Sequence, residues 1–280
     1  MSGCGQTAVS YDNPYDVYAT TGDLGLSGTG ECVEQTYFSE NLCVIDDTNI
    51  GTDGTHSNVA EGAGVFNLAT GTVNYAQNIY EKLYPASTTK ILTAYLALKY
   101  GNLDDLVTVS EYAAKQASDS SVCGLKAGDV VSLHDLLYGM MLKSGNDAAI
   151  AIAEHLSGSV EAFADLMNQE ANAMGATRSH FVNPNGLPDE DHYTSVYDLY
   201  LIFQNAVKDD RFVDIISTMS YDTSYTDAAG NPVEKTWENT NQYLVGKETP
   251  PDGITVVGGK TGTTGAAGYC LVLYSTNSAG

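Results

Sequence analysis

The chain has 280 residues, of which 43% are hydrophobic and 17% charged, a globular composition that allows one large domain or two small ones. Its 35 acidic and 12 basic residues give a formal net charge of −23. Such a charge repels nucleic acid and anionic lipid, and no run of 18 apolar residues is present to span a membrane. We therefore expect no nucleic-acid partner.

The first 58 residues are predicted to be an N-terminal extension or tether. They are rich in Thr, Asp and Gly and contain one possible strand, 41–45. Residues 2–4 read Ser-Gly-Cys, which resembles the end of a bacterial lipoprotein signal. Cys4 is thus a lipidation candidate and would be the chain's one link to a membrane, with chance occurrence of three small residues as the alternative.

The cysteines and histidines are scattered and form no metal-ligand pattern, so we expect no metal site. Cys32 and Cys43 bracket a short segment and can be bridged in an oxidising compartment, but their spacing does not decide it.

A single domain is predicted over residues 59–280.

Hydrophobic periodicity and turn residues divide this domain into successive elements. The pattern predicts, in order, a hairpin around 69–72, an apolar helix from Ser87 to Gly101, helices over 133–143, 148–156, 159–174 and 195–207, a hairpin around 230–232, and paired strands 254–263 and 269–274. Capping boxes are expected at Ser132-x-x-Asp135 and Ser195-x-x-Asp198.

Three short motifs carry chemical side chains. Ser87 and Lys90 lie three residues apart at a helix start, so the lysine amine can reach the serine hydroxyl, although a serine helix cap gives the same pattern. Residues 144–146, Ser-Gly-Asn, fall at a junction between two helices. Residues 260–262, Lys-Thr-Gly, fall in a β-branched strand whose glycines permit close approach of another backbone or a ligand.

These motifs, in this order, are the signature of penicillin-binding proteins and class A β-lactamases. Within that superfamily the chain resembles the serine-type D-alanyl-D-alanine carboxypeptidases, the low-molecular-mass penicillin-binding proteins of peptidase family S11. The middle motif Ser-Gly-Asn and the stretches 85–90, 142–149 and 183–187 are similar to that family, over about residues 60–280. The Glu-x-x-Leu-Asn loop of a class A β-lactamase is absent between the second and third motifs.

The resemblance implies an α/β (α+β) fold of the β-lactamase/transpeptidase type, with an antiparallel sheet flanked by helices and a helical subdomain. The family's sheet has a further strand, and usually a helix, after the strand that follows Lys-Thr-Gly. We expect this last strand to be absent from the chain, so that the catalytic domain 59–280 is C-terminally truncated or another segment completes the sheet.

The resemblance also assigns roles to the motif residues. Ser87 is the nucleophile, Lys90 the base, with a pKa lowered by burial and by the charge of Lys260, and Ser144 relays the proton to the leaving amine. Asn146 binds the substrate backbone or steadies Lys90. The substrate carboxylate is held by Lys260, Thr261, Gly262 and Thr263, and the oxyanion hole is formed by the backbone N–H groups of Ser87 and Thr263.

The expected function is removal of the terminal D-alanine from peptidoglycan stem peptides, without a cofactor, in the bacterial cell envelope outside the cytoplasm. β-Lactam antibiotics would acylate the same serine. Two alternatives stay open: a β-lactamase or esterase of the same superfamily, and a non-catalytic cell-wall sensor or binding module.

Overall fold

The computed structural model describes residues 41–51, 57 and 59–278. Cys4, Cys32 and most of the proposed extension lie outside the described residues, and the domain division at residue 58 stays a prediction. The strand predicted at 41–45 was wrong, because the backbone N–H of Cys43 donates to the Tyr200 hydroxyl at 2.8 Å instead of pairing with a strand. Cys43 is a buried free thiol. The possible bridge to Cys32 concerns a residue outside the described ones.

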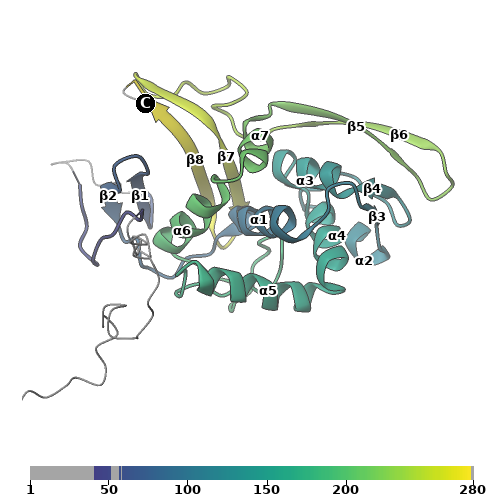
Figure 1. Ribbon diagram of the computed structural model, residues 1–280, viewed down its shortest axis with the longest axis horizontal. Coiled ribbons are helices and arrows are strands. Elements are labelled where there is room, and N and C mark those ends of the chain that lie inside the picture. Colours follow the sequence, from purple (N-terminus) through teal and green to yellow (C-terminus); the bar gives the residue numbers. More distant parts are fainter. Residues whose placement is uncertain (1–40, 52–56, 58, 279–280) are drawn as a thin grey trace, which may run out of the picture. The chain divides into compact units, whose positions relative to one another are not determined.

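The described residues form antiparallel strands and helices, which confirms the predicted fold class (Figure 1). The helices are the 3-10 turn η1 (Ala86–Thr89), α1 (Lys90–Tyr100), α2 (Glu111–Ala114), α3 (Leu133–Leu142), α4 (Asn146–Ser157), α5 (Val160–Ala173), α6 (Val196–Ala206) and α7 (Asp210–Ser217). The strands are β1 (Ala63–Asn67), β2 (Thr72–Gln77), β3 (Leu106–Thr108), β4 (Val130–Ser132), β5 (Ser220–Thr226), β6 (Pro232–Glu238), β7 (Ile254–Thr264) and β8 (Gly268–Asn277).

The strands are grouped into three antiparallel sheets. β1 pairs with β2 and β7 with β8, whereas β3, β4, β5 and β6 form a four-stranded sheet in that order. Within the described part of the chain, the β7–β8 pair has no hydrogen-bonded neighbour strand. The three predicted hairpins are present as β1–β2, β5–β6 and β7–β8. The short strands β3 and β4 and the helices α2 and α7 were not predicted.

Helix α1 is the centre of the helical core and packs against α3, α4, α5, α6 and α7. Its residues from Lys90 to Leu98 are buried except Tyr95, because apolar side chains surround the helix on all sides. Because α1 lies at the centre of the core, its first residue, Lys90, lies in the protein interior. Burial of Lys90 thus follows from the apolar sequence that comes after it.

Helix starts follow the expected side-chain signals. Ser132 Oγ accepts a hydrogen bond from the Asp135 backbone N–H at 3.0 Å, and Ser195 Oγ accepts one from that of Asp198 at 3.1 Å, so both predicted caps are present. None of the helices in the described part of the chain is long and apolar enough to cross a membrane.

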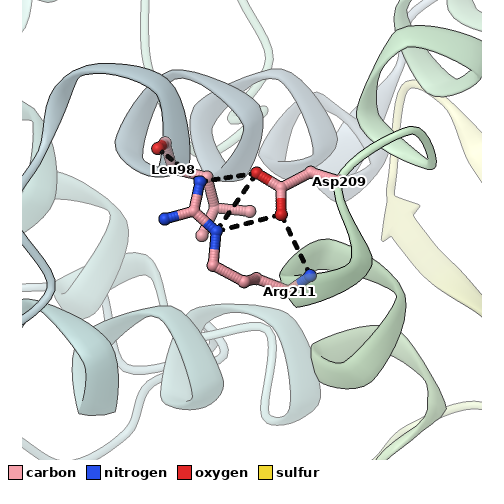
Figure 2. A network of polar contacts seen from close by, with 3 residues as sticks. All are labelled: Leu98, Asp209 and Arg211. Atoms are coloured by element: carbon pink, nitrogen blue, oxygen red, sulfur yellow. Dashed lines mark hydrogen bonds and ion pairs between the residues drawn. The ribbon is translucent and has the colours of Figure 1, made fainter.

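The start of α7 is tied to the end of α1 by one arginine. Figure 2 shows the Arg211 guanidinium beside the Asp209 carboxylate, with a closest N–O distance of 2.6 Å. The same group donates to the Leu98 carbonyl of α1 at 3.0 Å. Carbonyl groups in the last turn of a helix lack donors within their own helix, so this bond satisfies the Leu98 carbonyl.

Candidate active site

The nucleophile candidate lies on η1, immediately before α1. Neither η1 nor α1 has a side-chain cap, so the helix-cap alternative for Ser87 does not apply. The preceding residue, Ala86, has φ of 47° and is buried. A non-glycine residue in this left-handed region is strained and persists only where surrounding structure holds it.

Lys90 is completely buried and its side-chain nitrogen reaches three oxygen atoms. Nζ lies 3.1 Å from Ser87 Oγ, 2.8 Å from Asn146 Oδ1 and 2.7 Å from the Asn185 carbonyl oxygen. Burial, and next the nearby charge of Lys260, lower the pKa of Lys90 well below its usual 10.5. The site therefore places a lysine with a strong tendency to be neutral against a serine hydroxyl.

The second motif occupies the connection between α3 and α4. Ser144 has φ of 61°, a second left-handed residue at the site, and is buried. Lys260 Nζ donates to Ser144 Oγ at 3.0 Å and to the Thr261 carbonyl at 2.8 Å. Burial lowers the pKa of Lys260 to about 7.

The third motif lies on β7, with η1 against its glycine. A Cβ atom at Gly262 would lie 2.9 Å from the Ser87 backbone nitrogen, so the two backbones touch. Thr261 Oγ1 lies 2.7 Å from Thr240 Oγ1, and Thr263 Oγ1 donates to the Gly262 carbonyl at 2.8 Å.

The three motifs meet at a cleft of about 470 Å³. Five of the predicted residues line it: Ser87, Ser144, Thr261, Gly262 and Thr263. The other three, Lys90, Asn146 and Lys260, are buried; the two lysines contact the serine hydroxyls, and Asn146 contacts Lys90. The structure thus brings all eight predicted site residues together, with the hydroxyl groups lining the cleft and the lysine amines beneath them.

Two contributors had not been predicted as site residues. The Asn185 carbonyl is one of the three acceptors of Lys90, and Gly186 lies so close to η1 that a Cβ there would be 1.8 Å from the Ala86 carbonyl oxygen. The stretch 183–187 had been noted for its resemblance, and that is the one signal that could have identified them. A backbone carbonyl has no side chain that a pattern can reveal.

Asp147, next to the second motif, holds residues 123–125 in place through its side chain. Its buried carboxylate accepts from the backbone N–H groups of Cys123, Gly124, Leu125 and Ala148 at 2.9 to 3.0 Å. A carboxylate with four such donors is firmly held. Within the described residues no group of three His, Cys, Asp or Glu side chains could hold a metal ion.

Comparison with known proteins agrees with this geometry. A family model described as D-alanyl-D-alanine carboxypeptidase matches residues 52–279. The chain belongs to this family. The predicted resemblance is therefore confirmed, and the match includes all three motifs.

Curated members of the D-alanyl-D-alanine carboxypeptidase family are similar over most of the chain. DacF of Bacillus subtilis is 37% identical over 218 residues, which are 76% of this chain and 53% of DacF. DacC of Escherichia coli is 36% identical over 76% of this chain and 52% of its own. The chain thus spans about half the length of these relatives.

Solved structures of the family share the fold. The crystal structure of the Streptomyces K15 DD-transpeptidase is similar with a TM-score of 0.73 and 32% sequence identity, covering 79% of this chain and 87% of that chain. The family sequence named D-alanyl-D-alanine carboxypeptidase from Streptomyces sp. K15 is 34% identical over 78% of this chain and 76% of its own.

Proposed function

We propose that residues 59–280 are the catalytic domain of a serine D-Ala-D-Ala carboxypeptidase, and that residues 1–58 are an extension. The domain removes the terminal D-alanine from peptidoglycan stem peptides, and β-lactams acylate its serine. The observation that carries this proposal is the 3.1 Å contact between Ser87 Oγ and the Nζ of Lys90, a buried amine whose pKa is strongly lowered. A neutral amine beside a serine hydroxyl activates that hydroxyl as a nucleophile.

Acylation begins when Ser87 Oγ attacks the carbonyl carbon of the D-Ala-D-Ala bond and Lys90 Nζ takes the hydroxyl proton. The carbonyl oxygen gains negative charge and is stabilised by the backbone N–H groups of Ser87 and Thr263, a contribution of about 3 to 4 kcal/mol per donor. Contact between η1 and Gly262 supports this, since it holds the Ser87 nitrogen at β7.

The leaving D-alanine needs a proton on its amine as the C–N bond breaks. Ser144 Oγ supplies it and takes in exchange the proton that Lys90 Nζ received from Ser87, so that Lys90 is neutral again. Lys260 Nζ orients Ser144 Oγ through their 3.0 Å hydrogen bond. Water then attacks the Ser87 ester while Lys90 accepts the water proton, and Lys90 returns this proton to Ser87 Oγ as the ester bond breaks and the shortened peptide is released. Asn146 steadies Lys90 through its 2.8 Å contact, which supports the second of its two predicted roles.

The substrate carboxylate binds at the end of the cleft formed by β7. The charge comes from Lys260, and the hydroxyl donors are Thr261, Thr263 and, in addition, Thr240, whose Oγ1 lies 2.7 Å from that of Thr261. A carboxylate that displaces this hydroxyl contact gains two donors at once. This pocket makes the enzyme an exopeptidase.

Peptidoglycan lies outside the cytoplasm, so we infer an extracytoplasmic location in a bacterial cell envelope. The names of the curated relatives support this substrate. Attachment through a lipid on Cys4 is a further part of the proposal that concerns residues outside the described ones.

Intact-mass measurement after addition of a fluorescent penicillin, beside D-alanine release from a stem pentapeptide, tests the proposal. We expect one adduct that persists for many minutes, D-alanine release, and loss of both in Ser87→Ala. Rapid turnover of the adduct would indicate a β-lactamase instead. Absence of both adduct and D-alanine would indicate the non-catalytic sensor.

A further inference from the structure

His192 is a buried histidine behind the active site that the mechanism above does not use. Its side chain is 1% exposed, and it follows the loop 183–187 in the chain. One nitrogen of its ring contacts Val182, the residue before this loop, and the other contacts Thr89 of η1. The imidazole therefore bridges two segments that both contact Lys90.

The contacts of His192 define which ring nitrogen carries the proton. The Val182 backbone N–H donates to Nδ1 at 3.1 Å, so Nδ1 is an acceptor and carries no hydrogen. Nε2 lies 2.9 Å from Thr89 Oγ1 and is then the nitrogen that donates. Burial lowers the pKa of His192 to about 4, in agreement with a neutral ring; of its titratable neighbours, Asp189 raises this pKa and His180 lowers it.

Both ends of this bridge lead directly to Lys90. Thr89 is the residue before it, and three residues after Val182 comes Asn185, whose carbonyl accepts from Lys90 Nζ at 2.7 Å. Between them, the Pro184 carbonyl accepts from Thr93 Oγ1 at 2.6 Å. Pro184, directly before Asn185, is thus bonded to α1, and Val182 is bonded through His192 to η1.

We propose that His192 is a positioning residue for the Lys90 base. Its neutral imidazole joins Val182 to Thr89 and so holds the Asn185 carbonyl at Lys90 Nζ. The proposal rests on the proposed function, because it assigns His192 a role in the reaction of Lys90 with Ser87.

Loss of the bridge has a distinctive effect on the pH profile. The Asn185 carbonyl stabilises the cationic form of Lys90, so its withdrawal favours the neutral amine and moves the acidic limb of the acylation rate to lower pH. The maximal rate falls at the same time, because Nζ is no longer held toward Ser87 Oγ. Lys260, Cys123 and Asp147, the other titratable groups that act on Lys90, are unchanged.

Three substitutions separate the two halves of the bridge. His192→Asn keeps an acceptor for the Val182 N–H but is too short to reach Thr89. His192→Gln keeps a donor for Thr89 but loses the Nδ1 acceptor. Thr89→Val removes the hydroxyl with almost no change of volume, and Ile202→Val, a completely buried residue of α6, is the matched control for a small loss of stability.

The rate constant for acylation by a fluorescent penicillin is measured from pH 5 to pH 9 for each variant, with the affinity for a D-Ala-D-Ala peptide measured in a Ser87→Ala background. We expect His192→Asn and Thr89→Val to lower the maximal rate about tenfold and to move the acidic limb to lower pH. Peptide affinity stays within about twofold, and Ile202→Val behaves as the unsubstituted protein.

The proposal would be overturned if Thr89→Val kept the wild-type acylation rate and pH profile. It would also be overturned if the acylation rate of the variants fell by no more than their fraction of unfolded protein explains. If the His192 variants do not fold, Thr89→Val carries the test alone. A wild-type protein that penicillin does not label would overturn the proposed function and this inference together, whereas a labelled wild type with unaffected variants contradicts the inference alone.

Discussion

At the scale of single residues, the site depends on two buried lysines with different tasks. Lys90 contacts Ser87 and Lys260 contacts Ser144, and the charge of Lys260 is one of the causes that lower the pKa of Lys90. Since both amines are removed from water, the two cations destabilise each other. A protonated Lys260 beside a neutral Lys90 is the arrangement that the proposed mechanism requires.

The pKa of Lys260 near 7 predicts a pH dependence of carboxylate binding. A lowered lysine pKa means that the charged form is present below pH 7 and is lost above it. In the Ser87→Ala protein, we expect the Kd of a peptide ending in D-Ala-D-Ala to rise roughly tenfold between pH 7 and 8.5. The same peptide with a C-terminal amide is the control; an equal rise for both peptides would contradict the prediction.

The contact between Gly262 and Ser87 predicts a strong local effect of one methyl group. In Gly262→Ala the new Cβ lies 2.9 Å from the Ser87 nitrogen and 3.1 Å from Ala86 Cβ, so η1 must move. We expect acylation by penicillin to slow by about two orders of magnitude, since the nucleophile is misplaced relative to its base. Gly265→Ala, with open space around its Cβ, is the control and should keep the wild-type rate.

At the scale of elements, η1 is held between β7 on one side and the loop 183–187 on the other. Gly262 supplies the first contact and Gly186 the second. These two glycines explain how the left-handed Ala86 is maintained, since its carbonyl lies against the Gly186 Cα. The backbone strain thus lies directly before Ser87, the proposed nucleophile.

Gly186→Ala tests this packing. Gly186 has φ of 86° and its Cβ would meet the Ala86 carbonyl oxygen at 1.8 Å, so both strain and a clash follow. We expect a loss of more than about 3 kcal/mol in the free energy of unfolding. Gly230→Ala, at φ of 85° with no atom near its Cβ, has only the backbone strain and should lose about 1 kcal/mol in urea denaturation. Equal losses in the two variants would show that Gly186 lacks this contact.

The link between α7 and α1 predicts a modest effect on stability alone. Arg211→Met removes the donor to the Leu98 carbonyl and the ion pair with Asp209, both partly exposed to solvent. We expect a loss of about 1 kcal/mol, seen as a lower Tm, with an unchanged rate of penicillin acylation. Arg211→Lys should recover part of the loss. A slower acylation rate in Arg211→Met would mean that the link acts on the site.

At the scale of the whole molecule, the buried lysines make folding stability depend on pH. Between pH 7 and about 10.5, Lys260 is neutral in the folded protein and charged in the unfolded chain, which therefore binds more protons. The free energy of unfolding then rises with pH, by up to about 1.4 kcal/mol per unit for one group. Lys90 acts in the same direction because its pKa is also lowered.

The measurement compares the unsubstituted protein with Lys260→Met by urea denaturation at pH 7, 8 and 9. We expect the difference in unfolding free energy to change in favour of the unsubstituted protein as pH rises. A constant difference across these pH values would contradict a lowered pKa for Lys260.

Local patterns determined the elements that form without distant partners. The three hairpins and the serine-capped helices follow from alternation, helical periodicity and turn residues, which act over a few positions. The elements β3, β4 and α2 were missed because three or four residues are too few to show a period. Helix α7 was missed although Phe212, Ile215 and Ile216 are buried at helical spacing. The strand at 41–45 was wrongly predicted because its backbone bonds to the Tyr200 side chain. The ordered motifs were sufficient to indicate the family.

For the site, the sequence by itself determined which side chains are present: a serine and a lysine on one face, a second serine, and a lysine and a glycine on a strand. Only the tertiary structure decided their protonation and their support. A pKa depends on how completely the whole fold removes an amine from water, as at Lys90 and Lys260. The Asn185 carbonyl and the His192 bridge depend on contacts between segments about a hundred residues apart, and a backbone acceptor is the same in every residue until the fold gives it a partner.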